Sequence, residues 1–112
     1  MTQTRKELVQ AALNKQKVER IPVGFWFHFL PTPERADALA EPKLAVANIV
    51  GHRAFYEAFQ PDFVKLMSDG YFIYPNQGLA EINSAADFAR IRPLGENHPW
   101  IQQQISLVKQ LQ

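Results

Sequence analysis

Apolar residues follow two patterns along the chain, one typical of helices and one typical of strands. Near the start, Thr4 and Glu7 form a capping box, and the apolar residues that follow recur every three or four positions. This pattern predicts a helix over residues 5–14. The same spacing returns over residues 43–59, where it predicts a longer helix that packs one face against a sheet.

The second pattern is an unbroken apolar run, which is typical of a strand buried on both faces. Residues 23–30 follow a proline, and residues 63–67 lie between a Gln-Pro-Asp stop and the turn residues Ser68-Asp69-Gly70. Strand, helix and strand in this order predict a βαβ unit whose two strands are parallel.

Two further helices are predicted after the second strand. Ser84, with Asp87 three residues later, is typical of the start of a short helix that ends near Arg90. Pro99 favours the first turn of a last helix, whose apolar stripe continues to the end of the chain.

Two parallel strands do not make a stable sheet, because both outer edges stay unpaired. We therefore expect residues 1–112 to form a single partial domain, an α/β chain that is the N-terminal βαβ portion of a TIM (β/α)₈ barrel and is truncated. The alternative is a non-catalytic βαβ fragment that forms a homo-oligomer through its exposed strand edges.

Composition narrows the classes of function. The chain is 46% hydrophobic, and its 12 Lys and Arg residues mix with 11 Asp and Glu, so we expect no nucleic-acid partner. The chain has no cysteine, so it forms no disulfide or thiolate site. Proteins of the cytoplasm rarely contain disulfides, and we expect a cytoplasmic location. No stretch approaches the roughly 20 apolar residues of a membrane span, so no membrane partner is expected.

Two motifs carry a family resemblance. Residues 5–14 are followed by Val-Glu-Arg-Ile-Pro-Val at positions 18–23, and residues 61–70 read Pro-Asp-Phe-Val-Lys-Leu-Met-Ser-Asp-Gly. In this order and separation they resemble the N-terminal region of the uroporphyrinogen decarboxylase superfamily, which includes cobalamin-dependent methyltransferases for methanol, methylamine and methylated thiols. The resemblance covers nearly the whole chain.

The resemblance implies a barrel enzyme in the complete protein and inactivity of these residues alone. Asp69 matches the aspartate that binds the pyrrole nitrogens of the porphyrinogen and stabilises the charge formed as carbon dioxide leaves. The arginines that bind substrate carboxylates in the decarboxylase have no counterpart in residues 25–31. This departure favours the methyltransferase branch, which would use zinc and a corrinoid partner, with no cofactor or metal ligand supplied by this chain.

Asp69 and His28 are the first candidate site residues. Asp69 suits a turn, but in a barrel it would end the second strand at the active-site face, where we expect a catalytic role. His28 ends the first strand at the same rim, so it is expected to bind a small-molecule substrate or to act as an acid or base. The alternative for His28 is a packed core residue.

Lys65 and Tyr71 are further candidates for substrate binding. Strand alternation places Lys65 on the side of Asp69, inside the barrel, where it forms either a buried ion pair or a positive floor for an anionic substrate. Tyr71 either lines a pocket for a flat ligand or packs on the rim. His52 and His98 are expected at the surface.

Overall fold

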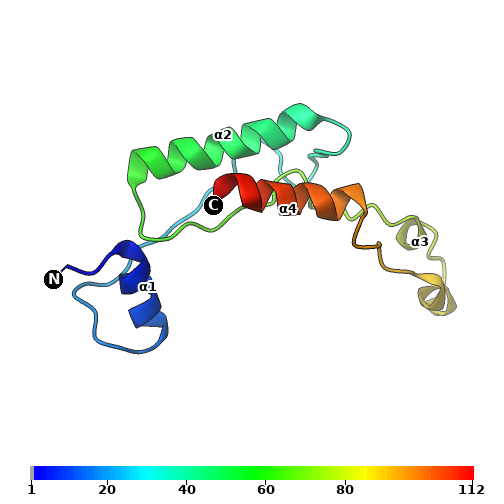
Figure 1. Ribbon diagram of the computed structural model, residues 1–112. Helices are drawn as coiled ribbons and strands as arrows, with labels where there is room; N and C mark the ends of the chain where they lie inside the picture. The colour runs from blue at the N-terminus through cyan, green and yellow to red at the C-terminus, as the bar shows by residue number, and fades with distance from the viewer. Residues whose placement is uncertain (1) are drawn as a thin grey trace.

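Helices and irregular segments make up the structure. The computed structural model describes residues 2–112, and its helices in chain order are α1 (Arg5–Leu13), α2 (Pro42–Phe59), α3 (Gln77–Ala80), η1 (Ala85–Arg90) and α4 (Pro99–Leu111). The two longest helices, α2 and α4, lie side by side, while α3 and η1 extend away from them (Figure 1). The molecule is elongated, with extents of 59 × 32 × 24 Å.

The predicted helices are confirmed, and their local signals act as expected. The Glu7 carboxylate accepts a hydrogen bond from the Thr4 backbone N–H at 2.8 Å, which completes the capping box of α1 and lowers the pKa of Glu7. The short helix predicted after Ser84 is a 3₁₀ helix, η1, and its backbone N–H at Ser84 donates to Asp87. α4 begins at Pro99, as the sequence predicts.

The strands predicted over residues 23–30 and 63–67 are wrong. Residues 2–112 contain no β-strand, so they contain no βαβ unit, and the predicted portion of a TIM barrel is wrong as well. The chain is a small all-helical fold, and both apolar runs are irregular (Figure 1). The alternative, a βαβ fragment that associates through exposed strand edges, is wrong for the same reason.

The two apolar runs still lie next to each other and point the same way. We name residues 23–30 the first segment and residues 62–69 the second segment. The contacts between them join residues 39 to 41 positions apart, and a nearly constant offset is typical of two parallel chains: Val23 with Asp62, Gly24 with Phe63, Trp26 with Lys65, and His28 and Phe29 with Asp69.

Side chains of α2 bind backbone groups that a strand ladder would use. The Met67 N–H donates to His52 Nε2 at 2.8 Å, and the Met67 carbonyl accepts from Asn48 Nδ2 at 3.0 Å. A backbone group that is bonded to a side chain of α2 is no longer free to pair with the first segment. Between the two segments, one backbone hydrogen bond is formed in the described residues, from Asp62 N–H to the Val23 carbonyl.

An ion pair fixes the start of both segments. The Asp62 carboxylate accepts two hydrogen bonds from the Arg20 guanidinium and one from the Val23 N–H, at 2.8 Å, although only 5% of the Asp62 side chain is exposed. The bonds from Arg20 and Val23 hold the pKa of Asp62 well below its usual range, and the same pair raises the pKa of Arg20.

The stability that Asp62 contributes should be lost in acid. Because the pKa of Asp62 is lower in the folded chain than the value of about 4 in an unfolded one, its contribution is complete above that value and declines as the pH falls toward the folded pKa. Asp62→Asn should therefore lower the free energy of unfolding at neutral pH, and the deficit should shrink steadily below about pH 4. Urea titrations across this range measure it, and a deficit that does not change with pH would refute the ion pair's role.

An aromatic cluster forms where the first segment crosses α2. The rings of Phe25, Phe27 and Phe29 contact Phe55 edge-on, with centroids 5.2, 5.6 and 6.1 Å away. The expectation that residues 23–30 are buried on both faces is wrong, because Phe27 is 53% exposed and Trp26 is 50% exposed. The contact with α2 therefore leaves much of the aromatic surface of this segment exposed.

Much apolar surface remains uncovered. The accessible surface of the described chain is 8252 Å², whereas a compact monomer of this mass exposes about 6,300 Å². Large exposed apolar side chains lie on both segments and on α2, among them Val23, Phe63, Val46 and Val50. Association into a homo-oligomer stays a prediction. None of the helices in residues 2–112 combines the length and the apolar character needed to cross a membrane.

Candidate functional site

Asp69 is the most deeply placed carboxylate of the structure, with an exposed fraction of 0%. Its Oδ2 accepts hydrogen bonds from the backbone N–H groups of Phe29, at 2.6 Å, and Leu30, at 3.3 Å. Gly70 follows with a φ of 95°, a conformation that favours glycine and turns the chain away from the second segment. The carboxylate is thereby fixed against the end of the first segment.

His28 is bound to this carboxylate. Its Nδ1 lies 2.9 Å from Asp69 Oδ1, and 52% of the His28 side chain is exposed. An ionised carboxylate accepts hydrogen bonds but donates none, so the hydrogen-bond partner assigns the proton to Nδ1. The other ring nitrogen, Nε2, has no partner among residues 2–112, and in the neutral imidazole it carries a free lone pair.

The sequence prediction that Asp69 and His28 lie together is confirmed, since the two side chains are hydrogen-bonded. The geometry changes how the pair can work. Both oxygens of Asp69 are occupied and buried, so the carboxylate meets a ligand through the exposed imidazole. The catalytic role of Asp69 and the substrate-binding role of His28 stay predictions.

Lys65 lies at the surface, so the predicted buried position is wrong. Without a barrel there is no closed interior for it to enter. Its ammonium lies over the Trp26 ring, 4.8 Å from the centroid. Among the described residues, no carboxylate forms an ion pair with it.

Tyr71 is buried, with 3% exposed, and it faces α4. Its hydroxyl donates to Gln103 Oε1 at 2.9 Å, and its carbonyl accepts from the Trp100 indole N–H at 3.1 Å. Burial raises the pKa of the Tyr71 hydroxyl, which keeps it in the neutral form. The structure therefore places Tyr71 in the packing between the second segment and α4. The neighbouring residue, Phe72, contacts the His28 ring edge-on at 5.9 Å.

His52 is the polar residue that the sequence interpretation misplaced. It was expected at the surface, but it is 2% exposed, and both of its ring nitrogens are bonded: Nδ1 to the Asn48 carbonyl and Nε2 to the Met67 N–H. The signal was present in the sequence, because Asn48 and His52 are spaced four apart and share a helical face with the buried Phe55.

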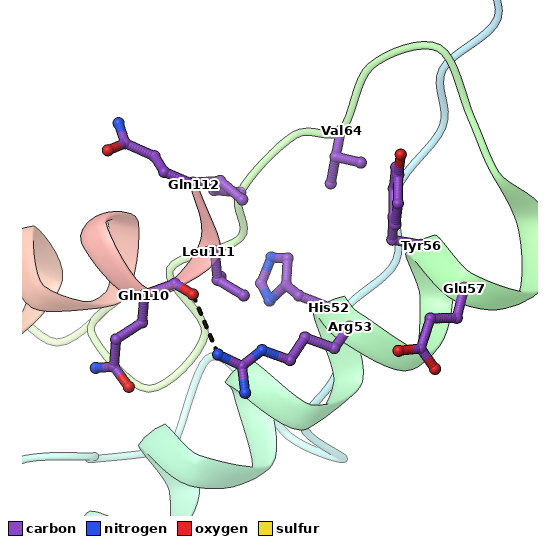
Figure 2. Close-up of a pocket in the computed structure, with 9 residues that line it drawn as sticks. His52, Arg53, Tyr56, Glu57, Val64, Gln110, Leu111 and Gln112 are labelled. Carbon is purple, nitrogen blue, oxygen red and sulfur yellow. Dashed lines mark hydrogen bonds between the residues drawn. The ribbon is translucent and has the colours of Figure 1, made fainter.

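A cavity of about 460 Å³ lies beside His52, between α2, the second segment and the end of α4 (Figure 2). The Arg53 side chain extends from α2 toward α4 and donates to the Gln110 carbonyl at 3.2 Å. His52 borders the cavity, but neither of its nitrogens is free. The imidazole of His52 is therefore no free acid or base for this cavity, and the side-chain carboxylate among its lining residues is that of Glu57.

The residues present do not fit the zinc ion that the methyltransferase branch implies. In residues 2–112, no three His, Cys, Asp or Glu side chains come close enough together to hold a metal ion. His28 and Asp69 provide two such side chains, and Asp69 is already saturated by hydrogen bonds.

Comparison with known proteins gives no match, because no protein family model, no curated protein and no solved structure is significantly similar to the chain.

Proposed function

We propose that the chain supplies a general base, the imidazole of His28 held by Asp69, to the site of a cytoplasmic enzyme that acts on a small molecule. We further propose that this enzyme belongs to the uroporphyrinogen decarboxylase superfamily, whose motifs residues 18–23 and 61–70 resemble. The absence of arginine in residues 25–31 favours its methyl-transfer branch over an octacarboxylate substrate. Zinc and a corrinoid partner would come from outside this chain.

One observation carries the proposal: a fully buried carboxylate is bonded to a half-exposed imidazole at 2.9 Å. The carboxylate holds the Nδ1–H tautomer and fixes the direction of the ring. Nε2 then faces solvent as the proton acceptor, and when it takes a proton, Asp69 stabilises the imidazolium. A base positioned in this way contributes about 10²–10⁴-fold to a rate.

The three histidines allow the base to be tested within one molecule. His98 is held in the opposite tautomer, because its Nδ1 accepts from the Trp100 N–H at 3.1 Å and its neutral ring must carry the proton on Nε2. His52 is buried with both nitrogens bonded. Exposure and tautomer therefore single out His28 as the reactive imidazole.

We expect diethylpyrocarbonate, which acylates an unprotonated imidazole nitrogen, to modify His28 several-fold faster than His98, and His52 last. Mass spectrometry of peptides taken at successive times gives the three rates. The built-in control is His98, a second histidine outside the buried core in the same sample. A His28 that reacts no faster than His98 would show that Asp69 does not hold Nε2 as a base.

A further inference from the structure

Residues 25–29 of the first segment alternate between two kinds of contact. Phe25, Phe27 and Phe29 contact α2 through Phe55. The residues between them pair with the second segment instead, Trp26 with Lys65 and His28 with Asp69. The ring that carries the Lys65 cation and the candidate base thus occupy alternate positions of the first segment, Trp26 and His28.

We infer that the substrate of this site is a small organic anion with a flat ring, whose anionic group binds Lys65 and whose reacting atom lies at His28. This inference rests on the proposed function and adds the class of substrate to it. It is carried by the position of the Lys65 ammonium, 4.8 Å from the centroid of the Trp26 ring.

The spacing suits such a molecule. Two residues of chain span at most about 7 Å, so the Trp26 and His28 backbones are no farther apart than that. An aromatic carboxylate is of similar length from its carboxyl carbon to a substituent on the opposite side of the ring. A molecule that lies on Trp26 and Lys65 is therefore within about one ligand length of the His28 backbone.

The side chains also suit it chemically. The Lys65 ammonium has donors left for a carboxylate, since no ion pair occupies it among the described residues. Trp26 is 50% exposed, and Phe72, which contacts His28, is 44% exposed. Both rings therefore offer exposed apolar surface to a flat ligand.

Benzoate and benzamide test the charge requirement, because the two molecules have nearly the same shape and differ in charge. The chain has two tryptophans, so its spectrum contains two indole N–H signals. Trp26 reports on the site, and Trp100, whose N–H donates to the Tyr71 carbonyl, is the internal control. ¹⁵N–¹H NMR of the full chain follows both signals during titration.

We expect benzoate to shift the Trp26 signal in a saturable way, to leave Trp100 in place and to slow the acylation of His28. Benzamide should bind at least about tenfold more weakly, since it forms no charge-assisted bond with Lys65. Lys65→Met should weaken benzoate binding by a similar factor, while Lys65→Arg, the matched control, should retain it. An equal response to benzamide, or full benzoate binding by Lys65→Met, would overturn the inference.

The two proposals fail separately. His28→Gln leaves Lys65 and Trp26 unchanged, so it should still bind benzoate. If the unmodified chain does not bind benzoate but His28 is acylated fast, the anionic substrate is rejected and the proposal that His28 is a general base stands. If the chain binds benzoate but His28 is acylated no faster than His98, the general base is rejected and a site for an anion remains.

Discussion

Replacing Asp69 by asparagine is expected to slow the acylation of His28 by about a hundredfold or more, with a much smaller loss of stability. The asparagine oxygen can still accept from the Phe29 N–H, which then directs its NH₂ group at His28 Nδ1. Nδ1 becomes the acceptor, so the neutral ring carries its proton on Nε2 and loses the free lone pair. ¹⁵N NMR of the ring nitrogens reports the tautomer, and mass spectrometry reports the rate.

Two variants bracket this result. Asp37→Asn makes the same change in an exposed turn, where Asp37 accepts from two backbone N–H groups, and it should leave His28 unaffected. Asp69→Ala removes both oxygens, strands the N–H groups of Phe29 and Leu30, and should cost about 1–3 kcal/mol of stability for each group left buried. If Asp69→Asn keeps the rate of His28, or lowers the free energy of unfolding as much as Asp69→Ala does, then Asp69 is a structural residue only.

His52→Phe is expected to lower the free energy of unfolding by about 3 kcal/mol. Phenylalanine keeps a flat ring against Phe29, whose centroid lies 4.4 Å from that of His52. It removes the acceptor of the buried Met67 N–H and the donor to the Asn48 carbonyl. The loss therefore measures the hydrogen bonds rather than the packing, and urea denaturation at neutral pH quantifies it.

Tyr56→Phe is the matched control for this experiment. It also deletes a polar group from a ring on α2, but the Tyr56 hydroxyl bonds to Arg5 at the surface, so its removal should change stability by no more than about 0.5 kcal/mol. A loss of similar size in the two variants would mean that Met67 finds another acceptor. In that case His52 would not hold the second segment on α2.

The helices could be predicted because their signals are local. The bond between Thr4 and Glu7 joins neighbours in sequence, and Pro99 fixes the first turn of α4 by its own ring. The strands could not be predicted in the same way. An apolar run indicates burial, but a ladder needs free backbone groups, and those of Met67 are taken by Asn48 and His52, 19 and 15 residues earlier.

Part of the candidate site was also open to prediction. His28 and Asp69 each follow an apolar run, and two parallel runs bring such residues together whether or not a ladder forms. The exposure of Lys65 was missed because strand alternation placed it inside a barrel. The burial of His52 was missed because a polar residue on the inner face of a helix was assigned to the surface.

The side-chain fastening of the second segment has a consequence for how this sequence can evolve. A strand ladder is made by the backbone and tolerates most replacements, whereas here the fastening depends on four side chains: Asp62, Asp69, Asn48 and His52. Each bonds a backbone group that has no other hydrogen-bond partner among residues 2–112. Divergence should therefore be free at exposed positions of the segment, such as Phe63, and restricted at these four. Related sequences that keep the fold should retain the four together.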